Sequence, residues 1–293
     1  MLFELSMNLN KRIVCTIGCF LLITALGCLT GCGTSASLVK KGIELEKAGR
    51  KTEALNCYNR AIADNPKNAQ AYFKRGTLRQ ADNDLEGAIK DYSRAVEIQP
   101  DFLEALFNRG TARAENGETA GAINDFSRVI AINPNNSMVY LQRGHLWIQN
   151  KEYEKAGQDF NQAIQNNPFS APAFNSRGIT RFYRQDYPGA MSDFNKAIEL
   201  NAQYANAYNN RGSLWMHKEK YDLAVRDFSN ALSIQPDYAN AYYNRGLAYF
   251  KRNDFSRALR DLEKAVSLEP IYRRKAAPYI AECRAKIKDK RSP

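Results

Sequence analysis

The sequence predicts an all-α fold, an α-solenoid of seven helix pairs followed by a capping helix, and three observations lead to this prediction. A unit of 34 residues recurs from residue 35 to residue 272. Glycine and proline each return at one fixed position of the unit. Apolar residues inside the unit are spaced three and four apart, as on one face of a helix. Such a period is typical of solenoids, in which each unit buries its apolar face only against its neighbours.

The glycines and prolines define the repeat boundaries. The glycines keep the step without a gap, at Gly42, Gly76, Gly110, Gly144, Gly178, Gly212 and Gly246. The prolines stand at Pro66, Pro100, Pro134, Pro168, Pro236 and Pro270, and only Ala202 interrupts their series. We therefore expect seven repeats, at residues 35–68, 69–102, 103–136, 137–170, 171–204, 205–238 and 239–272.

An apolar segment precedes the repeats. Lys11 and Arg12 stand before an uncharged run from Ile13 to Val39, whose apolar part is about as long as a bilayer-spanning segment. Two interpretations compete, an export signal with a basic start and an uncleaved membrane anchor.

A short motif at the end of this segment favours export. Residues 29–32, Leu-Thr-Gly-Cys, resemble the lipobox of bacterial lipoproteins, in which the cysteine is lipidated and becomes the new N-terminus. The resemblance implies a lipoprotein signal peptide at residues 1–31, lipid attachment at Cys32 and a tether at residues 32–34. The residue after the cysteine is Gly33. An Asp at that place would resemble the inner-membrane retention signal of Gram-negative lipoproteins. In a Gram-negative organism its absence favours the outer membrane, with the protein facing the periplasm.

The sixth repeat, residues 205–238, shows how each unit is built. Two sets of residues each share a helical face, Tyr208, Gly212 and Trp215 in the first half and Ala224, Phe228 and Ala231 in the second. They predict two short amphipathic helices. We expect a turn between them at Lys220 and Tyr221. Pro236 is expected to end the second helix, because its ring cannot continue one.

These residues resemble the tetratricopeptide repeat, whose pattern has an aromatic residue, a glycine, a large residue, A-x3-F, a small residue and a proline. The resemblance covers Ser35–Tyr272 and implies a right-handed solenoid. The fifth repeat departs most, with Pro172 and Pro188 near its expected helix starts, where proline is tolerated.

The last segment, residues 273–293, predicts a basic capping helix and tail. Apolar residues recur at helical spacing in Ala276, Ile280, Cys283 and Ile287, and such a helix would cover the exposed face of the last repeat. The segment holds eight Lys and Arg and two acidic residues. This charge could contact anionic lipid or a cell-wall polymer, or it could simply be solvated. Export argues against nucleic acid as a partner.

Six repeats pair an arginine with an aspartate sixteen residues later. The pairs are Arg75 and Asp91, Arg109 and Asp125, Arg143 and Asp159, Arg177 and Asp193, Arg211 and Asp227, and Arg245 and Asp261. A partly buried arginine needs a carboxylate, and its planar fork can bridge two helices or two repeats. We interpret the pairs as structural.

The family resemblance also implies a concave groove lined by the first helix of each repeat, where extended peptides or helices dock. The groove candidates are Phe73, Lys74, Phe107, Asn108, Gln142, Phe182, Asn210, Met216, Tyr243, Asn244 and Phe250. Asparagine can donate to and accept from a peptide backbone, and apolar anchors dominate interface energetics. In the alternative interpretation, the aromatic residues only pack between adjacent first helices.

The sequence gives no sign of catalysis, a cofactor or a metal. His145 and His217 lie in different repeats, without Cys or carboxylate at ligand spacing. No nucleophile–base pair or phosphate-binding glycine loop is present. No three consecutive repeats supply the carboxylate clamp of chaperone-binding tetratricopeptide domains; in the first repeat, for example, Val39 and Ile43 replace its first pair of residues.

The hypothesis that unites these features is a membrane-anchored protein–protein interaction scaffold of the bacterial cell envelope, docking an extended peptide or helix in its groove. It resembles the tetratricopeptide lipoproteins that serve envelope assembly, pilus biogenesis or recruitment of cell-wall hydrolases. Two alternatives are a cell-wall or carbohydrate-binding module that uses the groove aromatics and basic tail, and a cytoplasm-facing scaffold anchored by the leader.

Overall fold

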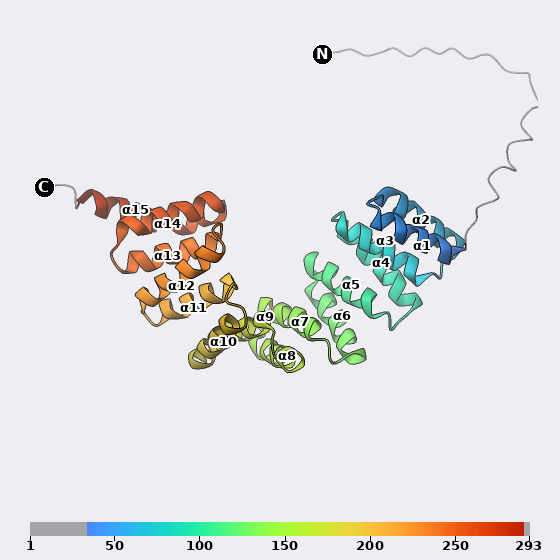
Figure 1. Cartoon of the computed structure of the whole chain (residues 1–293), viewed down its shortest axis with the longest axis horizontal. Helices are drawn as coiled ribbons and strands as arrows, with labels where there is room; N and C mark the ends of the chain where they lie inside the picture. The colour runs from blue at the N-terminus through green and yellow to red at the C-terminus, as the bar shows by residue number, and fades with distance from the viewer. Residues whose placement is uncertain (1–33, 290–293) are drawn as a thin grey trace, which may run out of the picture. The chain divides into compact units, whose positions relative to one another are not determined.

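The computed structural model describes residues 34–289, and their regular structure is entirely helical (Figure 1). Each of the seven repeats forms two helices. The first helices are α1 (Ser35–Lys47), α3 (Ala69–Ala81), α5 (Leu103–Glu115), α7 (Ser137–Gln149), α9 (Ala171–Tyr183), α11 (Ala205–His217) and α13 (Ala239–Lys251). The second helices are α2 (Lys51–Asp64), α4 (Leu85–Ile98), α6 (Thr119–Ile132), α8 (Tyr153–Asn166), α10 (Tyr187–Leu200), α12 (Tyr221–Ile234) and α14 (Phe255–Leu268). A 3-10 turn, Pro270–Tyr272, leads into α15 (Arg273–Asp289).

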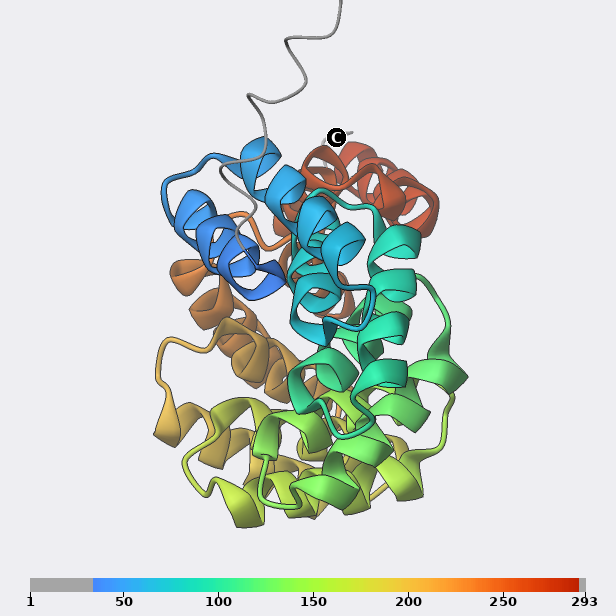
Figure 2. The ribbon, with the colours of Figure 1, turned by 90° about the vertical axis from the view of Figure 1, so that its right-hand side faces the viewer.

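The described residues divide into two compact units, residues 34–68 and residues 69–289. In the first unit α1 packs against α2, and the Ser35 hydroxyl donates to the carbonyl of Ala61 at 2.7 Å. In the second unit every helix contacts the helix that precedes it, and each first helix also contacts the first helix of the next repeat (Figures 1 and 2). This stacking confirms the predicted all-α solenoid with a capping helix.

The repeated glycine of each first helix is required by a large buried side chain of the second helix, an aromatic ring in six repeats and Leu262 in the seventh. A Cβ on Gly212 would lie 2.7 Å from the Phe228 ring, and one on Gly144 would lie 2.6 Å from the Phe160 ring. Both rings are fully buried. The two helices of a repeat can therefore approach closely only where the first has no side chain.

The turn between the helices of a repeat contains one residue in the left-handed region. These residues are Gly49, Asn83, Gly117, Lys151, Gln185, Glu219 and Asn253, with φ between 55° and 81°. The predicted turn at Lys220 and Tyr221 is displaced, because the turn occupies residues 218–220 and Tyr221 is the first residue of α12. Nothing in a single repeat marks Glu219, whereas glycine at the same position of two other repeats does.

Proline is not needed to end the second helices. The α10 helix ends at Leu200 although Ala202 replaces the usual proline. Asn201 caps it instead, since its side-chain oxygen accepts a hydrogen bond from the backbone of Gln203 at 2.9 Å. Asn65, Asn133 and Asn167 make the same turn in their repeats. The local competition of an asparagine side chain with the helix is enough to stop it.

The arginine and aspartate pairs each form a two-pronged ion pair between the two helices of one repeat. Arg109 Nε donates to Asp125 Oδ2 at 2.9 Å, and its Nη2 donates to Asp125 Oδ1 at 2.6 Å. The same geometry joins Arg75 to Asp91, Arg143 to Asp159, Arg177 to Asp193, Arg211 to Asp227 and Arg245 to Asp261. The hydrogen bonds that Arg211 donates to Asp227 raise the pKa of Arg211, so the guanidinium stays charged.

The third nitrogen of these arginines reaches back to the preceding repeat. Arg109 Nη1 donates to Ser93 of α4, and Arg211 Nη1 donates to Asn195 of α10 at 2.7 Å. Arg143, Arg177 and Arg245 make the equivalent bond to Ser127, Asn161 and Ser229. In five repeats an aromatic residue three positions earlier also lies against the guanidinium, as Tyr208 does 5.5 Å from Arg211. One side chain therefore sets three helices relative to one another.

The predicted capping helix covers the last repeat. Ala276 and Cys283 of α15 are fully buried, and Ile280 and Ile287 are half-buried. The Tyr279 ring lies 5.2 Å from the Phe250 ring of α13. The α15 helix thus closes the apolar end of the second unit.

The glycine contacts predict opposite effects for two alanine substitutions within one repeat. Gly144→Ala should lower the free energy of unfolding by about 1–3 kcal/mol, because the new methyl group meets the buried Phe160 ring. Gly157→Ala is the matched control, since its nearest neighbour would be Thr180 at 3.6 Å, an ordinary contact. There the gain in helix propensity, up to about 1 kcal/mol, should stabilise the protein. Urea unfolding followed by circular dichroism measures both, and equal effects would contradict the contact argument.

The ion pairs predict that removing one carboxylate destabilises the array. Asp125→Ala leaves the buried Arg109 without its carboxylate partner. It also removes a partner of Arg113, whose Nη1 lies 2.7 Å from the same carboxylate. We expect a loss of about 3–5 kcal/mol. Asp227→Ala should cost less, because Arg211 is more exposed and Asp227 forms an ion pair with this one arginine. Asp237→Ala, at an exposed position, is the control for urea unfolding.

Candidate functional site

The first helices of the second unit lie in contact and form one continuous surface, which we call the first-helix face. It consists of α3, α5, α7, α9, α11 and α13. All of the predicted groove residues belong to these helices. Cys32, the predicted lipid-attachment residue, lies outside the described residues.

A recess, which we call the proximal groove, lies near the amino ends of α5 and α7. Its volume is about 520 Å³. Its lining comes from four helices and the loop after α6: Phe73, Leu103, Glu104, Phe107, Asn108, Val129, Asn133, Asn136 and Met138. Apolar side chains make the walls, whereas a carboxylate and three amides provide polar contacts. Such a recess can take an apolar side chain and hold the polar backbone around it.

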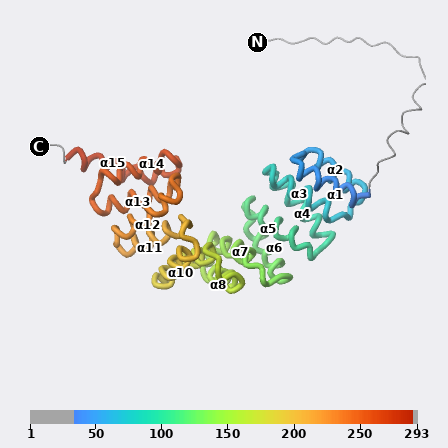
Figure 3. Tube along the Cα trace, viewed as in Figure 1, coloured from blue at the N-terminus to red at the C-terminus, as the bar shows by residue number. Residues whose placement is uncertain are grey.

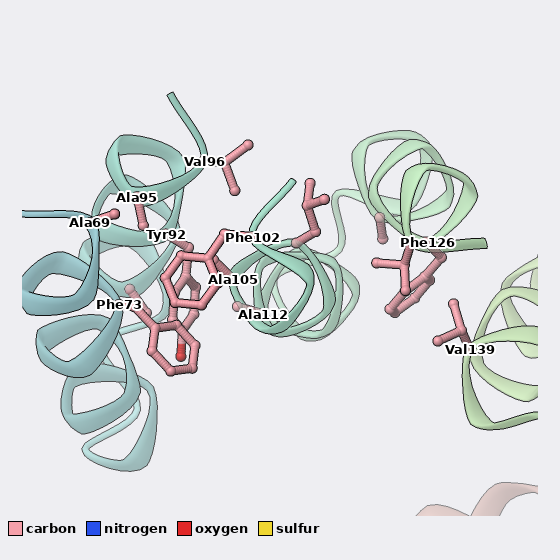
Figure 4. Close-up of a cluster of buried hydrophobic side chains, with 14 of the residues drawn as sticks. Ala69, Phe73, Tyr92, Ala95, Val96, Phe102, Ala105, Ala112, Phe126 and Val139 are labelled. Carbon is pink, nitrogen blue, oxygen red and sulfur yellow. The ribbon is translucent and has the colours of Figure 1, made fainter. Parts of the chain in front are cut away.

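The structure brings three of the predicted groove residues together in this recess. Phe107 is half-buried and lies 5.7 Å from the Phe126 ring, and Asn108 lies beside it in the lining. Phe73 is only 9% exposed and packs against Phe102, with ring centroids 4.9 Å apart (Figure 4). Phe73 therefore belongs mainly to the hydrophobic core and contributes the floor of the groove, as the packing interpretation expects for it.

Met138 projects into the proximal groove and was not predicted to do so. It is the second residue of α7, is 54% exposed and lines the recess. The signal was present in the sequence, because the other repeats have Ala36, Gln70, Glu104, Pro172, Asn206 and Asn240 at this position. A large flexible apolar side chain at such an exposed place is typical of adaptable binding surfaces.

A smaller recess, the distal pocket, lies between α9, α10 and α11. Its volume is about 150 Å³, and Ile179, Phe182, Tyr183, Phe194, Asn210 and Ser213 line it. Phe182, a predicted anchor, packs edge-on against Tyr187 at 5.6 Å and against His217 at 5.7 Å. Tyr183 beside it is 54% exposed. The pocket thus offers one apolar wall and two polar groups.

The asparagines of the distal repeats bond to one another across neighbouring first helices. Asn210 Nδ2 donates to Asn175 Oδ1 at 2.9 Å. Asn244 Nδ2 donates to Asn209 Oδ1 at 3.1 Å and to Asn240 Oδ1 at 2.8 Å. An amide nitrogen carries two hydrogens, so Asn244 offers a ligand mainly its oxygen. These amides tie the first helices together, a use that the sequence did not reveal.

The remaining predicted residues lie mostly between helices. Met216 packs with Ala224, Phe228 and Ala248, and Phe250 is edge-on to Phe255 and Tyr279. Tyr243 lies 5.1 Å from Tyr272, and burial raises its pKa. Lys74 Nζ lies 5.7 Å from the Phe73 ring, and Gln142 is half-buried on α7.

Within residues 34–289, no group of three or more His, Cys, Asp and Glu side chains is arranged to hold a metal ion. His145 Nε2 instead lies 2.8 Å from the Ser176 hydroxyl, across the contact between α7 and α9. In the same part of the chain no helix is both long and apolar enough to cross a bilayer.

Comparison with solved structures supports the fold. A tetratricopeptide-repeat protein from Parabacteroides merdae superposes with a TM-score of 0.69 at 24% identity, over 85% of this chain and 98% of its own. A chain of an APC/C hetero-tetramer gives 0.65 at 19% identity, over 85% of this chain and 48% of its own. YrrB, described as a TPR protein with an unusual peptide-binding site, gives 0.53 at 22% identity, over 63% of this chain and 95% of its own. A comparison with curated protein sequences gave no match.

Family profiles match nearly all of the repeats. One profile described as tetratricopeptide repeat matches residues 39–102 and 107–171. A second profile with the same description matches residues 239–272. A third, described as TPR repeat, matches residues 178–217 and 216–252. Together with the stacked helix pairs and the glycine and aromatic contacts inside them, these matches show that the chain belongs to the tetratricopeptide-repeat family.

Proposed function

We propose that this protein is a lipid-anchored scaffold of the bacterial cell envelope that binds a protein partner on its first-helix face. The observation that carries the proposal is the proximal groove, an open recess with apolar walls and a polar rim. The partner is a segment of protein, extended or helical, that places a large apolar side chain between Phe107 and Met138. Tetratricopeptide proteins typically act as such scaffolds rather than as enzymes.

The energetics favour an apolar anchor. Burying one large aliphatic or aromatic side chain contributes about 1.5–3 kcal/mol. Met138 supplies exposed apolar surface for this contact, and Phe73 gives the groove a rigid floor because the core fixes its ring. The side-chain oxygens of Asn133 and Asn136 already accept backbone bonds from Asn135 and Met138. Their amide nitrogens and the Asn108 amide can bond to the partner's backbone whatever its sequence.

Two structural neighbours support a protein or peptide as the ligand. YrrB is described as having a peptide-binding site, and the APC/C chain was crystallised within a hetero-tetramer. We extend this mode of use, binding another polypeptide through the repeat array, to the present chain.

The membrane part of the proposal rests on residues 29–32 of the sequence. A diacylglycerol and an amide-linked acyl chain on Cys32 would anchor the protein stably, as several acyl chains do and one does not. The first helix begins at Ser35, so the repeats would start within a few residues of the lipid. Gly33 favours the outer membrane and a periplasmic location.

A carbohydrate or cell-wall polymer is the alternative ligand, and one feature favours it. Tyr153 and Tyr183 form a stacked pair with centroids 4.9 Å apart and ring planes 9° apart, and Tyr183 is exposed. Exposed aromatic faces of this kind can also pack on sugar rings.

Binding through the proximal groove predicts a strong effect of one exposed substitution. Peptides that bind a chain beginning at Thr34 would be selected from a displayed library. Fluorescence anisotropy would then give their dissociation constants for that chain and for each variant. Met138→Glu should weaken their binding at least about tenfold, because it places a carboxylate in the apolar recess beside Glu104.

Leu223→Glu is the matched control, since Leu223 is also an exposed apolar residue but lies on a second helix, α12. It should leave the dissociation constant within about twofold. Equal peptide binding by the two variants would refute docking in the proximal groove. If no peptide is selected while the chain binds peptidoglycan, the ligand is the cell-wall polymer instead.

Lipidation predicts a different result for Cys32→Ala. Cells that express the native protein are fed a labelled fatty acid. The protein should incorporate the label and should be found in the membrane fraction. The Cys32→Ala variant should carry no label. Membrane recovery of an unlabelled native protein would instead support an uncleaved leader anchor.

A further inference from the structure

The junction between the last repeat and the capping helix combines an exposed apolar side chain with a run of bases. Ile271, in the 3-10 turn, is 74% exposed. Arg273, Arg274 and Lys275 follow in the first turn of α15, and all three are exposed. We call these four residues the junction patch.

The apolar member of the patch stands where most repeats are polar. The equivalent positions of the other repeats are Lys67, Asp101, Asn135, Phe169, Gln203 and Asp237. Five of these six are polar or charged, as expected for a loop residue in water. Phe169, which is 81% exposed, is the other exception, but the residues around it from Asn166 to Ala173 carry no charge. Among these seven equivalent loop positions, only Ile271 combines an exposed apolar side chain with neighbouring bases.

The bases of the patch do not stabilise the helix that carries them. Cations in the first turn of a helix face its positive end and are unfavourable there. The first turn of α15 contains no acidic residue, and the helix as a whole has six bases and two acids, Glu282 and Asp289. Glu269 is the nearest acidic residue before the patch in the sequence. The local field at the patch is therefore positive.

Packing holds this patch outward. Ala276 and Cys283 are buried on the opposite side of α15, and the Tyr279 ring contacts Phe250. Tyr272, next to Ile271, lies 5.1 Å from Tyr243 of α13. Arg284 is paired with Glu263 of α14 at 2.8 Å. The α15 helix lies beside α14 at the carboxyl end of the second unit (Figure 3), so the patch is a fixed terminal surface.

We propose that the junction patch is an interfacial binding site for an anionic phospholipid bilayer. Arg273, Arg274 and Lys275 bind lipid phosphates, and Ile271 enters the boundary between headgroups and acyl chains. Bases near an anionic membrane surface each add to binding, and an apolar side chain among them adds burial that does not depend on charge. An acidic polymer in water would use the bases but gain little from Ile271, which favours the bilayer.

The test uses a chain from Thr34 to Pro293, which keeps every helix and apolar cluster described above but lacks the leader and Cys32. Its binding is therefore independent of lipidation and of any groove partner. Cosedimentation with phosphatidylcholine vesicles, with and without phosphatidylglycerol, gives the partition coefficient. We expect binding only to the vesicles that contain phosphatidylglycerol.

Two sets of variants separate charge from insertion. Neutralising the three bases together, Arg273→Gln, Arg274→Gln and Lys275→Gln, should lower the partition coefficient on the order of a hundredfold. Ile271→Ser should lower it about tenfold, and this loss should persist when salt is raised moderately. Circular dichroism should show unchanged helix content, since all four side chains are exposed.

Two matched controls complete the design. Lys40→Gln, Lys41→Gln and Lys47→Gln together remove the same charge from the exposed side of α1, and Phe169→Ser removes an exposed apolar residue from the equivalent loop of the fourth repeat. Both should bind as the parent chain does. The proposal fails if the α1 variant loses as much binding as the patch variant. It also fails if Ile271→Ser has no effect while polyglutamate binds the chain equally well, an outcome that assigns the patch to acidic polymers.

Discussion

The fork of hydrogen bonds between arginine and aspartate is the constraint on which the rest of this structure depends. In each of six repeats a largely buried carboxylate of the second helix receives two N–H groups from the first helix. The same guanidinium in five of them reaches a Ser or Asn of the preceding repeat. A buried charge must be paired, and the planar fork is satisfied in one geometry only. The ion pair therefore sets the helix crossing in these six repeats, and in five of them it also sets the orientation on the repeat before.

This constraint decides which side chains remain for binding. With the glycine, the aromatic ring and the ion pair used for packing, each first helix has a narrow strip of residues to vary. Near α5 and α7 that strip is mainly apolar and open, because the exposed Met138 and the half-buried Phe107 line the recess. From α9 to α13 it is rich in asparagine, and Asn175, Asn209, Asn210, Asn240 and Asn244 bond to one another. One family framework thus carries two chemically different surfaces, of which the proximal one is better suited to an apolar anchor.

The repeats, their helix pairs and the capping helix could be predicted from the sequence, because periodic glycines and apolar residues act within one repeat or its nearest neighbour. The groove could be predicted only in outline. Phe73 has a groove position, yet its ring turns into the core, where it packs against Phe102 of the same repeat. Asn244 looks like a free peptide-binding amide until the spacing to Asn209 and Asn240 is known. Pro236 looked necessary to end a helix, but Asn201 ends α10 without a proline. Each of these outcomes depends on a rotamer or a distance that residue type alone does not determine.

The two proposed membrane contacts are the lipid on Cys32 and the junction patch, and they differ in strength. A few bases and one isoleucine bind a bilayer weakly and reversibly when they act alone. Once acyl chains hold the same molecule at the surface, the patch acts at a high effective concentration, so a weak site becomes largely occupied without any new contact. The lipid then provides the attachment, and the patch restricts the orientation of the second unit. Because the three bases supply most of the binding at the patch, higher ionic strength weakens the patch contact while the anchor holds. A scaffold built this way can change the presentation of its first-helix face to a partner without leaving the membrane.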